Sequence, residues 1–107
     1  VVQPDVVFVA AANLHIVKDR IWGAPDLVVE VLSPHPRIGR LDERLEWFAR
    51  YGVRECWLLH QDERRLEIVT FAGRAIDARR SITKDERISS RVLPGFDRPL
   101  GTVTRFA

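Results

Sequence analysis

Three carboxylates stand inside the most apolar segments of the chain, where a charged side chain is costly. Asp5 lies within VVQPDVVFVA, and Asp26 and Glu30 lie within PDLVVEVLS. An ionised carboxylate in a dry interior needs a cationic partner or a metal ion. Side chains four residues apart on a strand point to the same face, so Asp26 and Glu30 share a face. Their Cα atoms would be ~13 Å apart along the strand.

These acids suit a divalent metal site. Asp5, on a neighbouring strand ~4.8 Å away, would complete an oxygen-rich pocket that fits Mg²⁺ or Mn²⁺. Such an ion can activate water for attack on a phosphodiester. The alternative is that Asp5 and Asp26 follow Pro4 and Pro25 as strand-entry residues, while Glu30 pairs with an arginine of the next helix. Three acids in the two most apolar strands favour the metal site.

The elements that must position these acids follow from hydrophobic patterning. Residues 38–51 form a helix, because Ile38, Leu41, Leu45 and Phe48 recur at helical spacing and Gly52 then stops it. Segments rich in β-branched and aromatic side chains read as strands. They are residues 2–10, 25–33, 53–60 and 64–71, with weaker candidates at 75–82 and 87–93. Residues 99–106 are expected to form a short helical turn.

The order of these elements defines the fold class. A strand–helix–strand unit implies a right-handed crossover and at least one parallel strand pair, whereas the later strands form hairpins. We therefore predict an α/β (α+β) fold with a mixed β-sheet and a crossover helix on one face. At 107 residues, the chain fits a single domain spanning residues 1–107.

Composition and charge narrow the class of protein. Hydrophobic residues make up 46% and charged residues 30%, which is a globular rather than a disordered balance. No apolar run reaches the ~18–20 residues of a membrane span, so we expect no membrane association. The net charge is only +2, and its basic side is almost all arginine. Genome composition explains the arginine bias better than nucleic-acid binding does, because nucleic-acid domains usually carry a larger surplus.

The single cysteine argues for a reducing compartment. Cys56 has no partner for an internal disulfide, so a cytoplasmic location is expected. Cys56 and His60 are four residues apart on one strand, which raises the possibility of a thiol nucleophile. That spacing is too long for a direct hydrogen bond, so a small buried cysteine is the better interpretation.

A stripe on the helix carries the other candidate chemistry. Arg40, Arg44, Trp47 and Tyr51 recur at helical spacing and could contact phosphates and stack on bases. The alternative is that the aromatic rings pack against the sheet while the arginines are solvated. We favour packing for Trp47 and leave Arg40 open.

A family resemblance then emerges from the order of motifs. QPDVVFV, GAPDLVVEVLSP, a helix ending in ARYGV, RECWLLH and a late LPGF resemble the Uma-two family of restriction-endonuclease-like bacterial proteins, within the PD-(D/E)xK nuclease superfamily. The resemblance covers nearly all of the chain and is densest at APDLVVEVLSP. It implies that Asp5 and Glu30 are the two metal-binding acids and that Asp26 joins them. Members are mostly longer at the N-terminus, so we expect N-terminal elements of the restriction-endonuclease-like core to be missing here.

Three positions depart from the family pattern. Leu32 stands where the superfamily usually has a lysine, and Arg44 matches the lysine that the family carries on the following helix. His60 replaces an aspartate that tends to end the next strand. Arginine can hold a phosphate or stabilise transition-state charge, but it cannot act as a base because it does not deprotonate.

These features give two functional hypotheses. The first is a Mg²⁺- or Mn²⁺-dependent nuclease that hydrolyses nucleic-acid phosphodiesters, with DNA favoured over RNA. Asp5, Asp26 and Glu30 would hold the metal, and Arg44 would contact the scissile phosphate. The second is a catalytically degenerate domain that acts as an interaction or scaffold protein, which Arg44 favours. The sequence leaves the oligomeric state open, a homodimer included.

Overall fold

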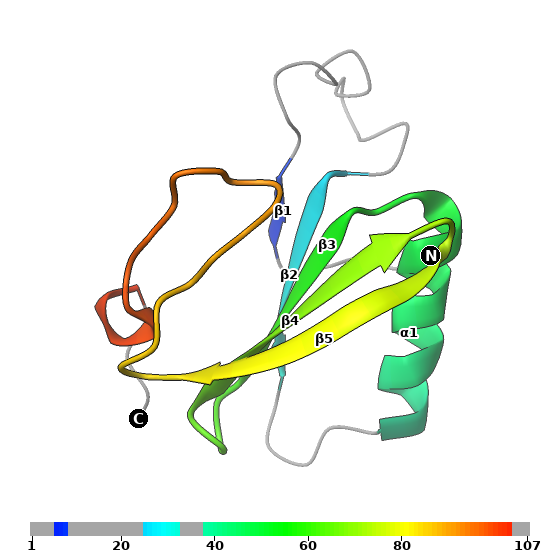
Figure 1. Cartoon of the computed structure of the whole chain (residues 1–107). Helices are drawn as coiled ribbons and strands as arrows, with labels where there is room; N and C mark the ends of the chain where they lie inside the picture. Colours follow the sequence, from blue (N-terminus) through cyan, green and yellow to red (C-terminus); the bar gives the residue numbers. More distant parts are fainter. Residues whose placement is uncertain (1–5, 9–24, 33–37, 104–107) are drawn as a thin grey trace.

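A five-stranded sheet with one helix on a face forms the centre of the molecule (Figure 1). The computed structural model describes residues 6–8, 25–32 and 38–103. Within them lie the following elements: β1 (Val6–Phe8), β2 (Leu27–Leu32), α1 (Ile38–Tyr51), β3 (Glu55–His60), β4 (Arg65–Ala72), β5 (Ala75–Thr83) and the 3₁₀ turn η2 (Leu100–Thr102). In this part of the chain, no helix is long and apolar enough to cross a membrane.

The sheet is mixed, as the sequence predicts. Its strand order is β1-β2-β3-β4-β5. β1 runs antiparallel to β2, β2 runs parallel to β3 through the α1 crossover, and β3, β4 and β5 follow as antiparallel hairpins. The register places Glu30 beside Leu58 of β3 and Leu58 beside Glu67 of β4. Two acidic residues therefore lie in one row across three strands.

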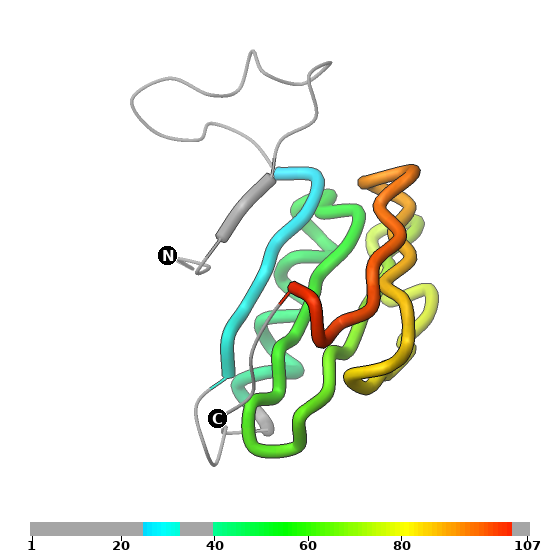
Figure 2. The backbone as a smooth tube through the Cα atoms, turned by 90° about the vertical axis from the view of Figure 1, so that its left-hand side faces the viewer, coloured from blue at the N-terminus to red at the C-terminus, as the bar shows by residue number. Residues whose placement is uncertain are grey.

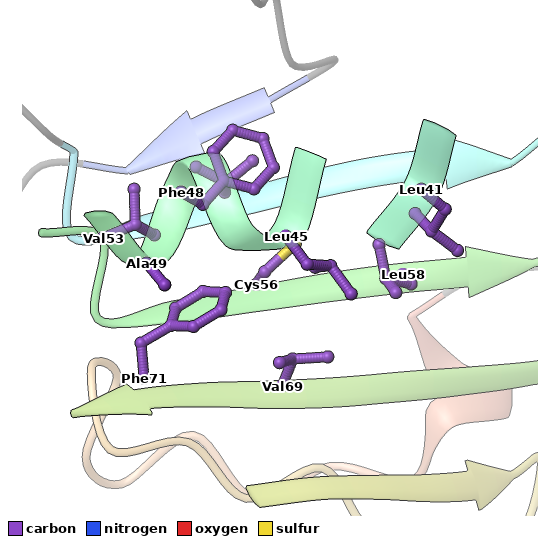
Figure 3. Close-up of a cluster of buried hydrophobic side chains, with 10 residues drawn as sticks. Leu41, Leu45, Phe48, Ala49, Val53, Cys56, Leu58, Val69 and Phe71 are labelled. Carbon is purple, nitrogen blue, oxygen red and sulfur yellow. The ribbon is translucent and has the colours of Figure 1, made fainter. Parts of the chain in front are cut away.

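Helix α1 has the predicted bounds and buries the predicted stripe. Leu41, Leu45 and Phe48 are buried, and Gly52 ends the helix with a φ of 94°. Glycine adopts this left-handed conformation without the cost that a Cβ atom would add. The helix packs onto one face of the sheet around a cluster that includes Cys56 and Leu58 (Figure 3).

The C-terminal segment covers the opposite face of the sheet. Ile88, Val92 and Leu100 pack there with Leu27 and Trp57 in a second buried cluster. Figure 1 shows α1 and this segment on opposite sides of the strands, and Figure 2 shows the segment running beside the sheet. The fold thus has three layers, with both faces of the central strands buried.

The prediction of a strand at residues 87–93 is wrong. Only an isolated bridge between Arg87 and Pro99 occurs there. The Ser90 hydroxyl accepts hydrogen bonds from the backbone N–H groups of Val92 and Leu93, both at 3.1 Å. A serine hydroxyl that binds local N–H groups in this way competes with a strand ladder, so the segment turns instead of extending.

Two strands start later than the sequence suggests, for one shared reason. The backbone carbonyl of Asp26 accepts from the N–H groups of Arg54 and Glu55, both at 3.2 Å. This contact joins the entries of β2 and β3, which begin at Leu27 and Glu55 rather than at residues 25 and 53. The two acids predicted on one strand therefore differ in setting, because Asp26 lies at a bend and Glu30 lies inside β2.

Candidate functional site

Glu30 is a buried carboxylate on the helix-covered face of β2. It is 7% exposed, and it points to the same face of β2 as Val28, two residues earlier, which belongs to the cluster under α1. Arg44 reaches it from α1, where its Nη2 donates to Glu30 Oε1. The Arg44 side chain itself is 34% exposed. The guanidinium thus neutralises a buried acid from the rim of the site and remains accessible to solvent.

This contact is the ion pair with an arginine of the next helix that the alternative interpretation of Glu30 expects. Helix α1 follows the Glu30 strand after a short connection, and Arg44 lies one position from the buried stripe of Leu41, Leu45 and Phe48. It therefore borders the sheet rather than projecting into solvent. The Arg44 guanidinium also lies 5.9 Å from the centre of the Phe48 ring, so its position is defined by both a charge and an aromatic contact.

Asp26 has an arginine partner of its own. It is 4% exposed, and its Oδ1 lies 3.4 Å from Nη1 of Arg54, a side chain that is 53% exposed. Since its backbone carbonyl also binds the β3 entry, Asp26 has a structural part as a strand-entry residue. This observation favours the alternative interpretation for Asp26 taken alone, although its carboxylate remains a suitable ligand for a hard cation.

The third predicted ligand, Asp5, lies outside the described residues. The structure does confirm that the strand following it, β1, neighbours the strand that carries Glu30, because Val6 pairs with Val29. Among the residues described, no group of three or more His, Cys, Asp and Glu side chains could hold a metal ion. Asp26 and Glu30 therefore do not form a complete cation site by themselves.

A second polar cluster on the same face is not anticipated by the sequence analysis. Glu67 of β4 is 8% exposed, and its Oε2 accepts from Nε of Arg79 at 2.7 Å. His60 Nε2 lies 3.3 Å from Glu67 Oε1. Burial raises the pKa of Glu67, but the hydrogen bonds and charges of Arg79 and His60 outweigh it, so the pKa lies below its usual value. The available signal was an acid between Leu66 and Ile68, as apolar a setting as that of Glu30.

Glu55 is a fourth buried acid, and it points to the other face of the sheet. It is 1% exposed and accepts from Trp57 Nε1 at 2.8 Å and from the Arg91 backbone N–H at 3.2 Å. The Ser90 hydroxyl also donates to it. Glu55 therefore ties the C-terminal segment to the sheet and takes no part in the Glu30 site.

Cys56 is a buried free cysteine, as the sequence indicates. Burial raises the pKa of its thiol, the Glu30 charge raises it further, and the Arg44 charge lowers it. A thiol with a raised pKa is protonated near neutrality and is a poor nucleophile. The structure thus supports packing rather than catalysis for Cys56, and it places the thiol within the field of the Glu30–Arg44 pair.

The aromatic stripe of α1 divides into a packed ring and an exposed one. Trp47 is partly buried against the core cluster, which confirms the packing interpretation. Tyr51 is 61% exposed and stacks on Trp47, with ring centroids 4.0 Å apart and planes 25° apart. Arg40 is exposed on the same stripe.

Comparisons with known proteins agree with this geometry. The family model described as "Uma2: Putative restriction endonuclease" matches residues 1–101. A solved structure, a "putative nuclease belonging to DUF820" from Anabaena variabilis, is similar in fold with a TM-score of 0.61 at 17% identity. The match covers 79% of this chain but 46% of that one, so the chain spans less than half of that protein. No curated protein is significantly similar to the chain. With nearly its whole length matched, the chain belongs to the Uma2 family and has a restriction-endonuclease-like fold.

Proposed function

We propose that this chain carries the core of a divalent-metal-dependent nuclease. In this proposal Asp5, Asp26 and Glu30 hold Mg²⁺ or Mn²⁺, and Arg44 contacts the scissile phosphate of a nucleic acid. One observation carries it: a buried carboxylate, Glu30, has an accessible guanidinium, Arg44, directly on it. A buried acid beside a phosphate-binding group suits the hydrolysis of a phosphodiester.

The donor chemistry fits a hard cation. Mg²⁺ and Mn²⁺ prefer carboxylate oxygens. Asp26 and Glu30, the two proposed ligands that the structure describes, are buried, and each is paired with an arginine. Asp5 supplies the third ligand in this proposal. It directly precedes Val6, whose partner Val29 directly precedes Glu30. The residue that follows Asp5 in the sequence therefore lies beside the Glu30 strand, which supports the choice of Asp5 as the third ligand.

The protein's own side chains would then exchange partners. Asp5, Asp26 and Glu30 would hold Mg²⁺, which would supply positive charge near the phosphodiester and make water a better nucleophile near neutral pH. With the charge of Glu30 balanced in this way, Arg44 would be free to turn its fork of N–H donors to the phosphate, a geometry that suits guanidinium. Arg44 stays protonated, so it would bind and orient the phosphate and would not accept the proton of the attacking water.

A scaffold function is the competing proposal. Asp26 and Glu30 are each paired with an arginine, as expected of a domain in which guanidinium groups have replaced the metal ion. Arg44 also stands where the family carries a lysine. Under this second proposal the ion pairs only support the fold. The nuclease proposal is preferred because Arg44 is accessible, and because the family description names an endonuclease, which makes DNA the preferred substrate over RNA.

Cleavage of mixed DNA and RNA substrates with Mn²⁺ tests the proposal. We expect wild type and Arg44→Lys to cut and Glu30→Gln to be inactive. Glu46→Gln is the matched control, because Glu46 is an exposed acid on α1. Cleavage that survives Glu30→Gln would reject the mechanism. Absence of cleavage in every form would support the scaffold.

A further inference from the structure

One exposed aromatic ring stands out in the part of the chain that the structure describes. Tyr51 is 61% exposed, and the other described aromatic side chains are buried or half-buried. The remaining exposed large apolar side chains of the described residues are Val31, Ile76 and Val103, which lie outside α1. Tyr51 is therefore an isolated ring and does not belong to a continuous apolar patch of the kind that binds a folded protein.

The core fixes the orientation of this ring. Tyr51 stacks on Trp47 at 4.0 Å, and Trp47 meets the buried Phe48 edge-on at 5.9 Å with planes 75° apart. Phe48 is 2% exposed and belongs to the cluster under α1. One face of the tyrosine is thus covered by a ring anchored in the core. A preordered ring loses little conformational entropy when it binds a second ring.

Arginines stand on the same stripe of the helix. Arg40, Arg44, Trp47 and Tyr51 are spaced by four, three and four residues, so they project from one side of α1. We call these residues the α1 stripe. Arg44 lies two turns, ~10.5 Å, from Tyr51 along the axis. Because Arg44 pairs with Glu30, the stripe leads directly to the proposed catalytic site.

We propose that the α1 stripe binds single-stranded DNA, with an unpaired base stacked on Tyr51 and phosphates bound by Arg40 and Arg44. A flat ring stacks on any base, whereas flanking guanidinium groups bind the backbone. A base inside a duplex is already stacked on its neighbours and cannot offer its face without being extruded. The inference rests on the proposed function for its choice of DNA, and it adds that the strand enters the site unpaired.

Binding without metal tests this inference separately from cleavage. A fluorescently labelled strand of about 12 nucleotides, within the usual site size, is titrated with the 107-residue chain in EDTA, and anisotropy gives the Kd. We expect Tyr51→Ala to raise the Kd about tenfold or more, whereas Tyr51→Phe keeps the ring and the affinity. Ile76→Ala, at an exposed apolar residue on β5, is the matched control and should not change the Kd.

Three further probes identify the ligand. An abasic strand with the same phosphates should bind wild type about as weakly as the normal strand binds Tyr51→Ala. A duplex should show no dependence on Tyr51. A single strand of RNA with the same sequence shows whether the unpaired base must come from DNA. RNA binding as tight as that of DNA would overturn the assignment of DNA.

The two proposals fail in different ways. Equal affinity of wild type and Tyr51→Ala, with Glu30-dependent cleavage intact, would overturn the stacking inference alone. Tyr51-dependent binding with no cleavage by any form would reject the nuclease and leave the docking site standing. Circular dichroism of each variant confirms the fold, and the abasic strand tests the ring in the wild-type protein without any substitution.

Discussion

Removing the Arg44 guanidinium should destabilise the fold through Glu30. The Glu30 side chain is 9% exposed and that of Arg44 is 34% exposed. A hydrogen bond to a charged group contributes ~1.5–3 kcal/mol, and breaking a fully buried ion pair costs ~3–5 kcal/mol. Solvent at Arg44 screens part of this interaction, so we expect Arg44→Ala to lower the free energy of unfolding by ~1–2 kcal/mol.

Thermal and urea denaturation measure this change. For a domain of this size the loss corresponds to a fall in Tm of roughly 5–15 °C. Arg40→Ala is the matched control, because it removes an exposed arginine one turn earlier on the stripe and should change stability by less than ~0.5 kcal/mol. In a Glu30→Gln background Arg44→Ala should cost less, as a double-mutant cycle would show. Equal stability of the two arginine variants would refute the ion-pair argument.

Three more predictions concern the rest of the buried polar network. Cys56 should resist iodoacetamide in the native state because burial raises its pKa, and rapid native modification would contradict this. Glu67 has a lowered pKa, so its contribution to stability is present above its unfolded value of about 4.3 and is lost as the pH falls through its folded value. The urea midpoint should therefore fall less steeply on acidification in Glu67→Gln than in wild type. Equally steep curves would contradict a stabilising role of the Glu67 charge. Ser90→Ala removes a hydrogen-bond donor from Glu55 and should lower the free energy of unfolding, measured by urea denaturation, by ~1–3 kcal/mol. An unchanged stability would show that Ser90 does not hold the C-terminal segment on the sheet.

Local patterns in the sequence predict the elements that local interactions determine. Helix α1 has its predicted bounds because Leu41, Leu45 and Phe48 set its buried face and Gly52 sets its end. The β2–α1–β3 crossover follows from chain order, since a strand–helix–strand unit returns to a parallel neighbour. The contact between Arg44 and Glu30 then follows from the helix phase.

The remaining features depend on contacts distant in sequence. The C-terminal segment does not form the predicted strand, because Glu55 and Ser90 accept hydrogen bonds from the backbone N–H groups of residues 91–93. The periodicity of the sequence does not predict such bonds. Glu67 meets Arg79 across a hairpin, so its partner depends on the β4–β5 register. Asp26 shows a third limit: its carbonyl binds the β3 entry, a backbone contact that its side-chain type does not predict.

Metal binding tests the central claim most directly. Tm is measured with and without millimolar Mg²⁺ or Mn²⁺ in wild type, Asp5→Asn, Glu30→Gln and the control Asp62→Asn, which alters an exposed hairpin acid. If the proposed acids bind the metal, Tm should rise in wild type and in Asp62→Asn and should change little in Asp5→Asn and Glu30→Gln. At a metal concentration a hundredfold above Kd, binding raises the free energy of unfolding by ~2.7 kcal/mol. No shift in wild type, or an equal shift in Asp5→Asn, would contradict a metal site built on Asp5, Asp26 and Glu30.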